Sequence, residues 1–96
     1  MRDYTHFYIN GAWVKPLKAH PMPVINPATE QAVGTISIGT AADANVAVMA
    51  ARKAFAAQSV MPVAQRQELL QSIIAVYKKR MDDVAIAVSE EMGAPL

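Results

Sequence analysis

The stretch VGTISIGTAAD, residues 33–43, contains the change from strand-like to helix-like sequence. Residues 1–39 contain three of the four glycines and four of the six prolines, whereas residues 40–92 contain one proline and no glycine. Proline and glycine favour turns and are unfavourable inside helices. This contrast predicts an α+β fold, with a β-hairpin region over residues 1–39 followed by a helical region over residues 40–96.

Two turn signals lie in the first region. Asn10 and Gly11 stand between short β-favouring runs, a pattern typical of a type I′ hairpin turn, whose central residues both have positive φ. The sequence NPAT at residues 26–29 predicts a second turn. We expect it to join short antiparallel strands at residues 24–25 and 33–38, so the region should contain two small hairpins.

The sequence also indicates the structure of the connection between the hairpins and the position where the first helix starts. Residues 15–23 contain three prolines and should form an extended surface connection. Thr40 and Asp43 resemble a capping box, with aspartate in place of the usual glutamate, so a helix should follow Thr40 and run to about residue 57. This helix is apolar nearly all round, and such a helix is normally covered on several sides.

Two further helices are expected. Pro62 suits the first turn of the second, whose apolar residues recur at helical spacing over residues 69–77. Basic residues 78–80 followed by acidic residues 82–83 suggest a break between helices, because the helix dipole favours these charges at opposite ends. The third helix should cover residues 83–92 and end at Gly93. Its apolar face, which we expect to be buried, consists of Val84, Ala85 and Val88.

The composition excludes several classes of protein. With 53% apolar and 18% charged residues, the chain is too apolar to be disordered. A net charge of +1 argues against nucleic acid as a partner, because phosphate binding needs a basic face. Apolar runs fall well short of the about 18 residues of a membrane span, and the polar N-terminus lacks signal-peptide features, so a cytoplasmic location is expected.

Candidate catalytic groups are few. The chain lacks cysteine, and its two histidines, His6 and His20, are too few and too far apart for a zinc site. Adjacent carboxylates at Glu90 and Glu91 would point about 100° apart on a helix and therefore do not converge. The residues alone predict a fold fragment, not a catalytic site.

Five stretches, taken together, resemble the N-terminal segment of NAD(P)-dependent aldehyde dehydrogenases, in the order and spacing of that family. The stretches are YINGAW at residues 8–13, VINPAT at residues 24–29, the helix sequence of residues 43–55, RQELL at residues 66–70 and EMGAP at residues 91–95. The last resembles a family motif with lysine where this chain has Ala94.

The resemblance implies that this segment is an incomplete part of the α/β Rossmann-like cofactor domain of a longer, homo-oligomeric enzyme. Such an enzyme oxidises an aldehyde to a carboxylic acid with NAD or NADP, using a cysteine nucleophile, a glutamate and an asparagine. These catalytic groups and the main cofactor-binding residues would lie downstream, so no catalytic or cofactor-binding residue is assigned here. The segment alone should be inactive.

The resemblance also implies a site for Na⁺ or K⁺. Its ligands would include the backbone carbonyls of Val24 and Ile25 and the carboxylate of Glu91, with a further ligand from another part of the enzyme. Oxygen-only ligation suits a hard cation. The family more often has aspartate at the position of Glu91.

Two alternatives remain open at this stage. A non-catalytic helical interaction module would use the apolar helix of residues 44–57 to bind a partner helix. Self-association of the segment, with or without exchange of elements, would cover the same surface. The reading frame beyond Leu96 distinguishes the interaction module from the dehydrogenase. The molar mass of the segment in solution tests self-association.

Overall fold

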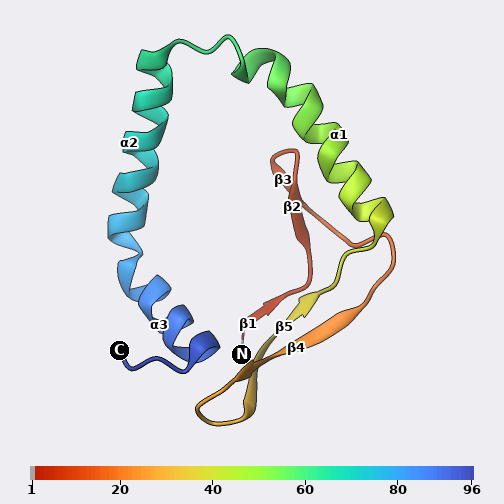
Figure 1. Ribbon diagram of the computed structural model, residues 1–96, viewed down its shortest axis with the longest axis vertical. Coiled ribbons are helices and arrows are strands. Elements are labelled where there is room, and N and C mark those ends of the chain that lie inside the picture. The colour runs from red at the N-terminus through yellow and green to blue at the C-terminus, as the bar shows by residue number, and fades with distance from the viewer. Residues whose placement is uncertain (1) are drawn as a thin grey trace.

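The computed structural model describes residues 2–96, in which all strands precede all helices (Figure 1). The strands are β1 (Arg2–Tyr4), β2 (Phe7–Ile9), β3 (Ala12–Val14), β4 (Pro21–Asn26) and β5 (Gln31–Ser37). The helices are α1 (Ala41–Gln58), α2 (Val63–Lys79) and α3 (Met81–Met92). The described chain is thus an α+β segment, as the distribution of glycine and proline predicts.

The first hairpin forms where the Asn-Gly pair predicts it. β2 and β3 pair antiparallel, and the turn residues Asn10 and Gly11 have φ values of 53° and 76°. Both values lie in the left-handed region that a type I′ turn requires. Tyr8 faces Trp13 across the hairpin, and their ring centroids lie 5.2 Å apart in an edge-to-face arrangement.

The second predicted hairpin is confirmed and belongs to a larger sheet. β4 and β5 pair antiparallel across the NPAT turn, and β1 adds to the other side of β5 in parallel, giving the order β1-β5-β4. In this turn the side chain of Asn26 accepts a hydrogen bond from the Ala28 N–H at 2.9 Å. The strand β1 was not predicted, because a parallel partner far along the chain leaves no local signal.

The expected extended connection over residues 15–23 is wrong at its C-terminal end. β4 begins at Pro21, and Pro21 and Pro23 both lie within it. Proline is tolerated there because β4 is an edge strand of the sheet, where an N–H is not needed on the outer side.

The capping box at the start of α1 is present as predicted. The Thr40 hydroxyl accepts a hydrogen bond from the Asp43 N–H, and the Asp43 carboxylate accepts one from the Thr40 N–H. The predicted break between the second and third helices is confirmed, and Arg80 is the one residue between α2 and α3. The helix α3 begins at Met81, two residues before the predicted start. Pro62 directly precedes α2 rather than lying in its first turn.

No apolar side chain among residues 2–96 is buried. The radius of gyration is 16.9 Å, against about 13 Å for a compact domain of this size. Figure 1 shows why: α1 and α2 form an open arch, and the strands lie only beside α1 and α3 and leave α2 uncovered. The predicted burial of Val84, Ala85 and Val88 is therefore wrong for this chain, since no described element packs over that face of α3.

The helices of residues 2–96 do not have the features of membrane-spanning helices. None of them combines the length and the apolar character that crossing a bilayer requires.

Candidate functional site

The end of α3 docks on the turn between β4 and β5. Gly93 ends the helix in the left-handed conformation, with φ 73°, and its N–H donates to the Ser89 carbonyl at 2.9 Å. A Cβ on Gly93 would lie 3.0 Å from Pro27 Cγ and 3.3 Å from the Ala28 nitrogen. The EMGAP and NPAT stretches, far apart in sequence, therefore pack directly against each other.

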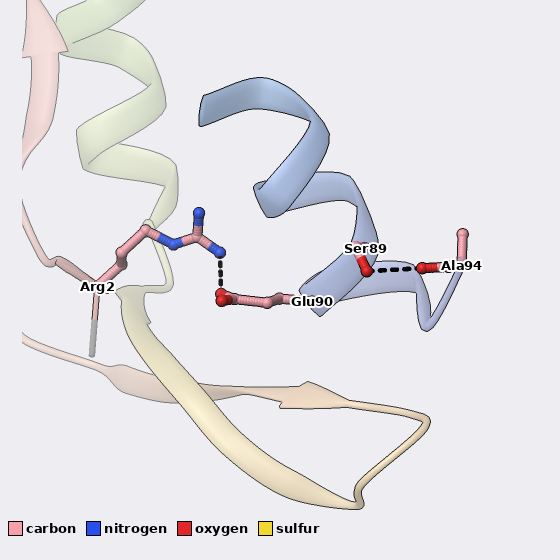
Figure 2. A network of polar contacts seen from close by, with 4 residues as sticks. All are labelled: Arg2, Ser89, Glu90 and Ala94. Atoms are coloured by element: carbon pink, nitrogen blue, oxygen red, sulfur yellow. Dashed lines mark hydrogen bonds and ion pairs between the residues drawn. The ribbon is translucent and has the colours of Figure 1, made fainter. Parts of the chain in front are cut away.

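The segment that follows α3 is held by a side-chain hydrogen bond. The Ser89 hydroxyl donates to the Ala94 carbonyl at 2.6 Å, which folds the chain back across the helix end (Figure 2). This bond needs only the backbone of residue 94, so the replacement of the family's lysine by Ala94 leaves the turn intact.

An ion pair joins α3 to the first strand. The Arg2 guanidinium on β1 donates a hydrogen bond to the Glu90 carboxylate, as Figure 2 shows. The backbone of Arg2 is itself fixed, because β1 pairs with β5 at Gly34 and a Cβ at Gly34 would overlap the Arg2 carbonyl oxygen. Only glycine permits this approach of the two strands.

A small cavity of about 30 Å³ lies between the sheet and α3. It brings together two of the three residues that the resemblance implies as cation ligands, Val24 of β4 and Glu91 of α3. Ile25 follows Val24 in β4 and does not line this cavity. The complete lining is Arg2, Tyr4, Val24, Val33, Gly34, Ile36 and Glu91.

The strands are irregular at this cavity. The register of the β4–β5 pair shifts between Val24 and Ile25, which face Gly34 and Ala32, so Val33 is the extra residue of a β-bulge. A bulge interrupts the ladder of backbone hydrogen bonds and bends the strand. The irregularity falls at the two carbonyls that the resemblance implies as ligands.

The cavity is large enough for a single small ion, and Glu91, the one carboxylate among its lining residues, shares that lining with Arg2. A cavity of about 10–15 Å³ is enough to hold one water molecule, so the observed volume can hold one ion of similar size. Residues 2–96 hold no group of three or more histidine, cysteine, aspartate or glutamate side chains placed to bind a metal. A site built from one carboxylate and backbone carbonyls does not need such a group and suits a hard cation.

Arg2 is the residue at this site that the sequence could not reveal. It is separated from Glu90 by 88 positions, and neither residue belongs to a recognisable motif. Glu91 belongs to the EMGAP motif, whereas nothing in the sequence assigns a role to the neighbouring Glu90. In the structure both side chains of the ion pair are partly covered, with 31% and 40% of their surface exposed.

A second polar cluster surrounds Asp43, which is only 6% exposed. Its carboxylate accepts hydrogen bonds from the Leu17 N–H and the Thr40 N–H, both at 2.9 Å, and from the Thr40 hydroxyl at 3.0 Å. The backbone donor of Leu17, followed by that of Thr40, holds the pKa of Asp43 below its ordinary value. These bonds fasten the connection after β3 to the start of α1, so Asp43 has a structural role.

Comparison with known proteins agrees with this arrangement. The profile of the aldehyde dehydrogenase family matches residues 13–96. The chain is 50% identical over all 96 residues to a 3-succinoylsemialdehyde-pyridine dehydrogenase of Pseudomonas sp. and 45% identical to a putative aldehyde dehydrogenase of Staphylococcus aureus. In each case it covers 20% of the relative.

A solved structure shows the same backbone arrangement. The crystal structure of an aldehyde dehydrogenase from Bartonella henselae superposes on 99% of this chain with a TM-score of 0.97 and 41% sequence identity. The chain spans one fifth of that protein's length, 20%. The open arch and the small sheet are thus the shape of a segment of a larger fold, and the chain belongs to the aldehyde dehydrogenase family.

Proposed function

We propose that this chain is the N-terminal segment of an enzyme that oxidises an aldehyde to a carboxylic acid with NAD or NADP. The observation that carries the proposal is the match over the whole chain, at 50% identity, to a protein named as a semialdehyde dehydrogenase. In the complete enzyme the segment would form part of a Rossmann-like cofactor domain, and the enzyme would be a homo-oligomer.

The exposed apolar surface supports this proposal. Large apolar side chains remain exposed on all three helices, and isolated domains rarely show so much apolar surface. In a protein of the relatives' length this surface would pack against the rest of the cofactor domain. The cytoplasmic location inferred from the polar N-terminus stays a prediction.

The experiment is an activity assay of the complete protein. It should reduce NAD or NADP, followed by the absorbance of the reduced nicotinamide, in the presence of a panel of aliphatic, aromatic and semialdehyde substrates. The 96-residue segment, purified in the same way, is the control and should be inactive. Absence of reduction with every aldehyde and both cofactors would contradict the proposal.

A helical interaction module is the competing function, and the exposed apolar face of α1 is the observation that favours it. The two functions differ in what surrounds that face. In a dehydrogenase the apolar side chains of α1 would be protected from solvent within the complete protein, whereas in an interaction module they would stay accessible until a partner binds. Hydrogen exchange of α1 in the complete protein, without any partner, separates the two.

The cavity between the sheet and α3 is proposed as a monovalent cation site. The carboxylate of Glu91 and the carbonyl of Val24 would supply two oxygens, and the carbonyl of Ile25 would join if the bulge turns it inward. The site lies where α3 docks on β4, so a bound cation would stabilise this junction rather than take part in chemistry.

A matched pair of variants tests this site in the complete protein. Glu91→Gln removes the proposed charged ligand, whereas Glu68→Gln removes an exposed carboxylate of α2 that lies outside the cavity. K⁺ or Na⁺, compared with tetramethylammonium at equal ionic strength, should raise the melting temperature of the wild type and of Glu68→Gln. Glu91→Gln should lose this saturable increase, and a retained increase would contradict the site.

A further inference from the structure

The strand β1 is held at both of its ends by side-chain bonds to different elements. Just beyond its C-terminal end, the Thr5 carbonyl accepts a hydrogen bond from the Ser37 hydroxyl of β5 at 2.7 Å. At its N-terminal end, Arg2 forms the ion pair with Glu90 of α3 (Figure 2). Between these bonds β1 pairs with β5 over three residues and forms one edge of the sheet. This short edge strand therefore connects the sheet to the last turn of α3.

The helix α3 is not packed continuously on the sheet. Cavities of about 390 and 410 Å³ lie between it and the strands, beside the small one of about 30 Å³, and Arg2 lines all three. No apolar side chain of α3 is buried. Across this open space the Arg2 side chain reaches Glu90, and among residues 2–96 this is the one ion pair that joins two elements of secondary structure.

The end of α3 thus has two attachments to different parts of the sheet. Glu90 is bound to β1, and Gly93, three positions later, packs on Pro27 in the turn between β4 and β5. A helix end attached at one point can pivot about that point, whereas a second attachment on another strand prevents the rotation. The ion pair supplies the second attachment.

We propose that β1 is a strap that keeps the end of α3 docked on the sheet, with the ion pair between Arg2 and Glu90 as its fastening. Detachment of β1 from β5 and undocking of the last turn of α3 are then one coupled event. The coupling is reciprocal, because a change that weakens either attachment weakens the other by the same factor. This inference concerns the conformation of the segment and is independent of the proposed activity and of any bound ion.

The strap also helps to fix the direction in which the polypeptide leaves α3. Ser89 precedes Glu90 in the sequence, and its hydroxyl holds the Ala94 carbonyl, so the residues after the helix are folded back against its end. Fixing this helix end from β1 fixes that segment as well. In a protein of the relatives' length, the N-terminal strand would therefore guide the path of the polypeptide that follows the helices.

Glutamine variants of the complete protein test the coupling. Arg2→Gln and Glu90→Gln each remove one charge of the ion pair, and a double variant removes both. The exchanged pair, Arg2→Glu with Glu90→Arg, replaces the attraction in the opposite sense. Gly34→Ala detaches β1 in a different way, because the three atoms nearest to its added Cβ all belong to the Arg2 backbone. Hydrogen exchange, measured by mass spectrometry in peptides that cover β1 and residues 87–96, is the readout.

The expected changes appear on the far side of each substitution. Glu90→Gln should speed the exchange of β1, and Arg2→Gln should speed that of residues 87–96. Each change should be about two- to fivefold, as for the loss of a partly exposed ion pair. The double variant should show no larger effect than either single variant, and the exchanged pair should restore most of the protection. Asp83→Asn, the control, removes the exposed ion pair at the start of α3 and should leave the exchange of β1 unchanged.

Two results would overturn the inference. If Arg2→Gln and Glu90→Gln change exchange only in the element that carries the substitution, or if their effects add in the double variant, the ion pair does not hold the helix end. If Gly34→Ala speeds the exchange of β1 and leaves residues 87–96 as in wild type, the strand and the helix end open independently.

Discussion

Gly93, at the end of α3, packs directly against Pro27 in the turn between β4 and β5. The contact joins two motifs from opposite ends of the chain and depends on a residue without a side chain in a left-handed conformation. It places Glu91 beside Val24, and with them the cavity that we propose as a cation site.

Gly93→Ala should destabilise the complete protein through both conformation and contact. The left-handed φ costs a residue with a Cβ about 1–2 kcal/mol, and the new methyl group would press on Pro27 and Ala28. Gly11→Ala is the matched control, because Gly11 also has positive φ but has no atom within 4 Å of the added Cβ. Urea unfolding should show a larger loss of unfolding free energy for Gly93→Ala than for Gly11→Ala. Equal losses would contradict the role of the contact between Gly93 and Pro27.

Gly34→Ala should separate β1 from β5. The added methyl group would overlap the backbone of Arg2, which cannot move away without breaking the parallel pairing. We expect faster hydrogen exchange in β1 and a loss of at least about 1 kcal/mol in unfolding free energy, as is usual for overpacking. Gly39→Ala is the control, since its methyl group would meet the Phe7 ring at an ordinary 3.5 Å. Unchanged exchange in β1 of Gly34→Ala would count against this prediction.

Asp43 should make the stability of the protein sensitive to acid. Its pKa is lowered in the folded state by backbone hydrogen bonds from Leu17 and Thr40. A carboxyl group whose pKa is lower in the folded state than in the unfolded state stabilises the protein at pH values above its unfolded-state pKa, which is near 4. This stabilisation is lost as the pH falls through the folded-state pKa. The free energy of unfolding, measured with urea between about pH 6 and pH 3, should therefore fall less in Asp43→Asn than in wild type. Asp3→Asn, at an exposed position of β1, should follow the wild type.

The isolated 96-residue segment should lack a cooperative unfolding transition. It buries no apolar side chain among residues 2–96, and hydrophobic burial is the main term that offsets chain entropy. Urea titration followed by circular dichroism should give a broad change, and the exposed helices should bind a dye such as ANS. A sharp transition without dye binding, in a segment that sediments as a monomer, would be the contrary result.

The features that the sequence predicts correctly are those with local causes. The hairpin at Asn10 and Gly11 follows from two residues that tolerate positive φ, and the start of α1 follows from hydrogen bonds between Thr40 and Asp43. The end of α3 at Gly93 has the same kind of origin. In each case the atoms that determine the structure lie within a few positions of one another.

The features that sequence reasoning missed depend on distant partners. The strand β1 exists because β5 lies beside it, and the ion pair between Arg2 and Glu90 follows from that pairing. The apolar face of α3 has a clear helical period, yet Val84 and Val88 are 39% and 44% exposed. Periodicity identifies the face that can be buried but does not identify what covers it.

The open arch of α1 and α2 has a consequence for biosynthesis. In a protein of the relatives' length, the ribosome would release these helices before the later parts of the polypeptide that could shield them are made. Exposed apolar surface of this kind promotes aggregation and attracts chaperones. The nascent protein would therefore pass through a vulnerable interval, whose length depends on the speed of translation.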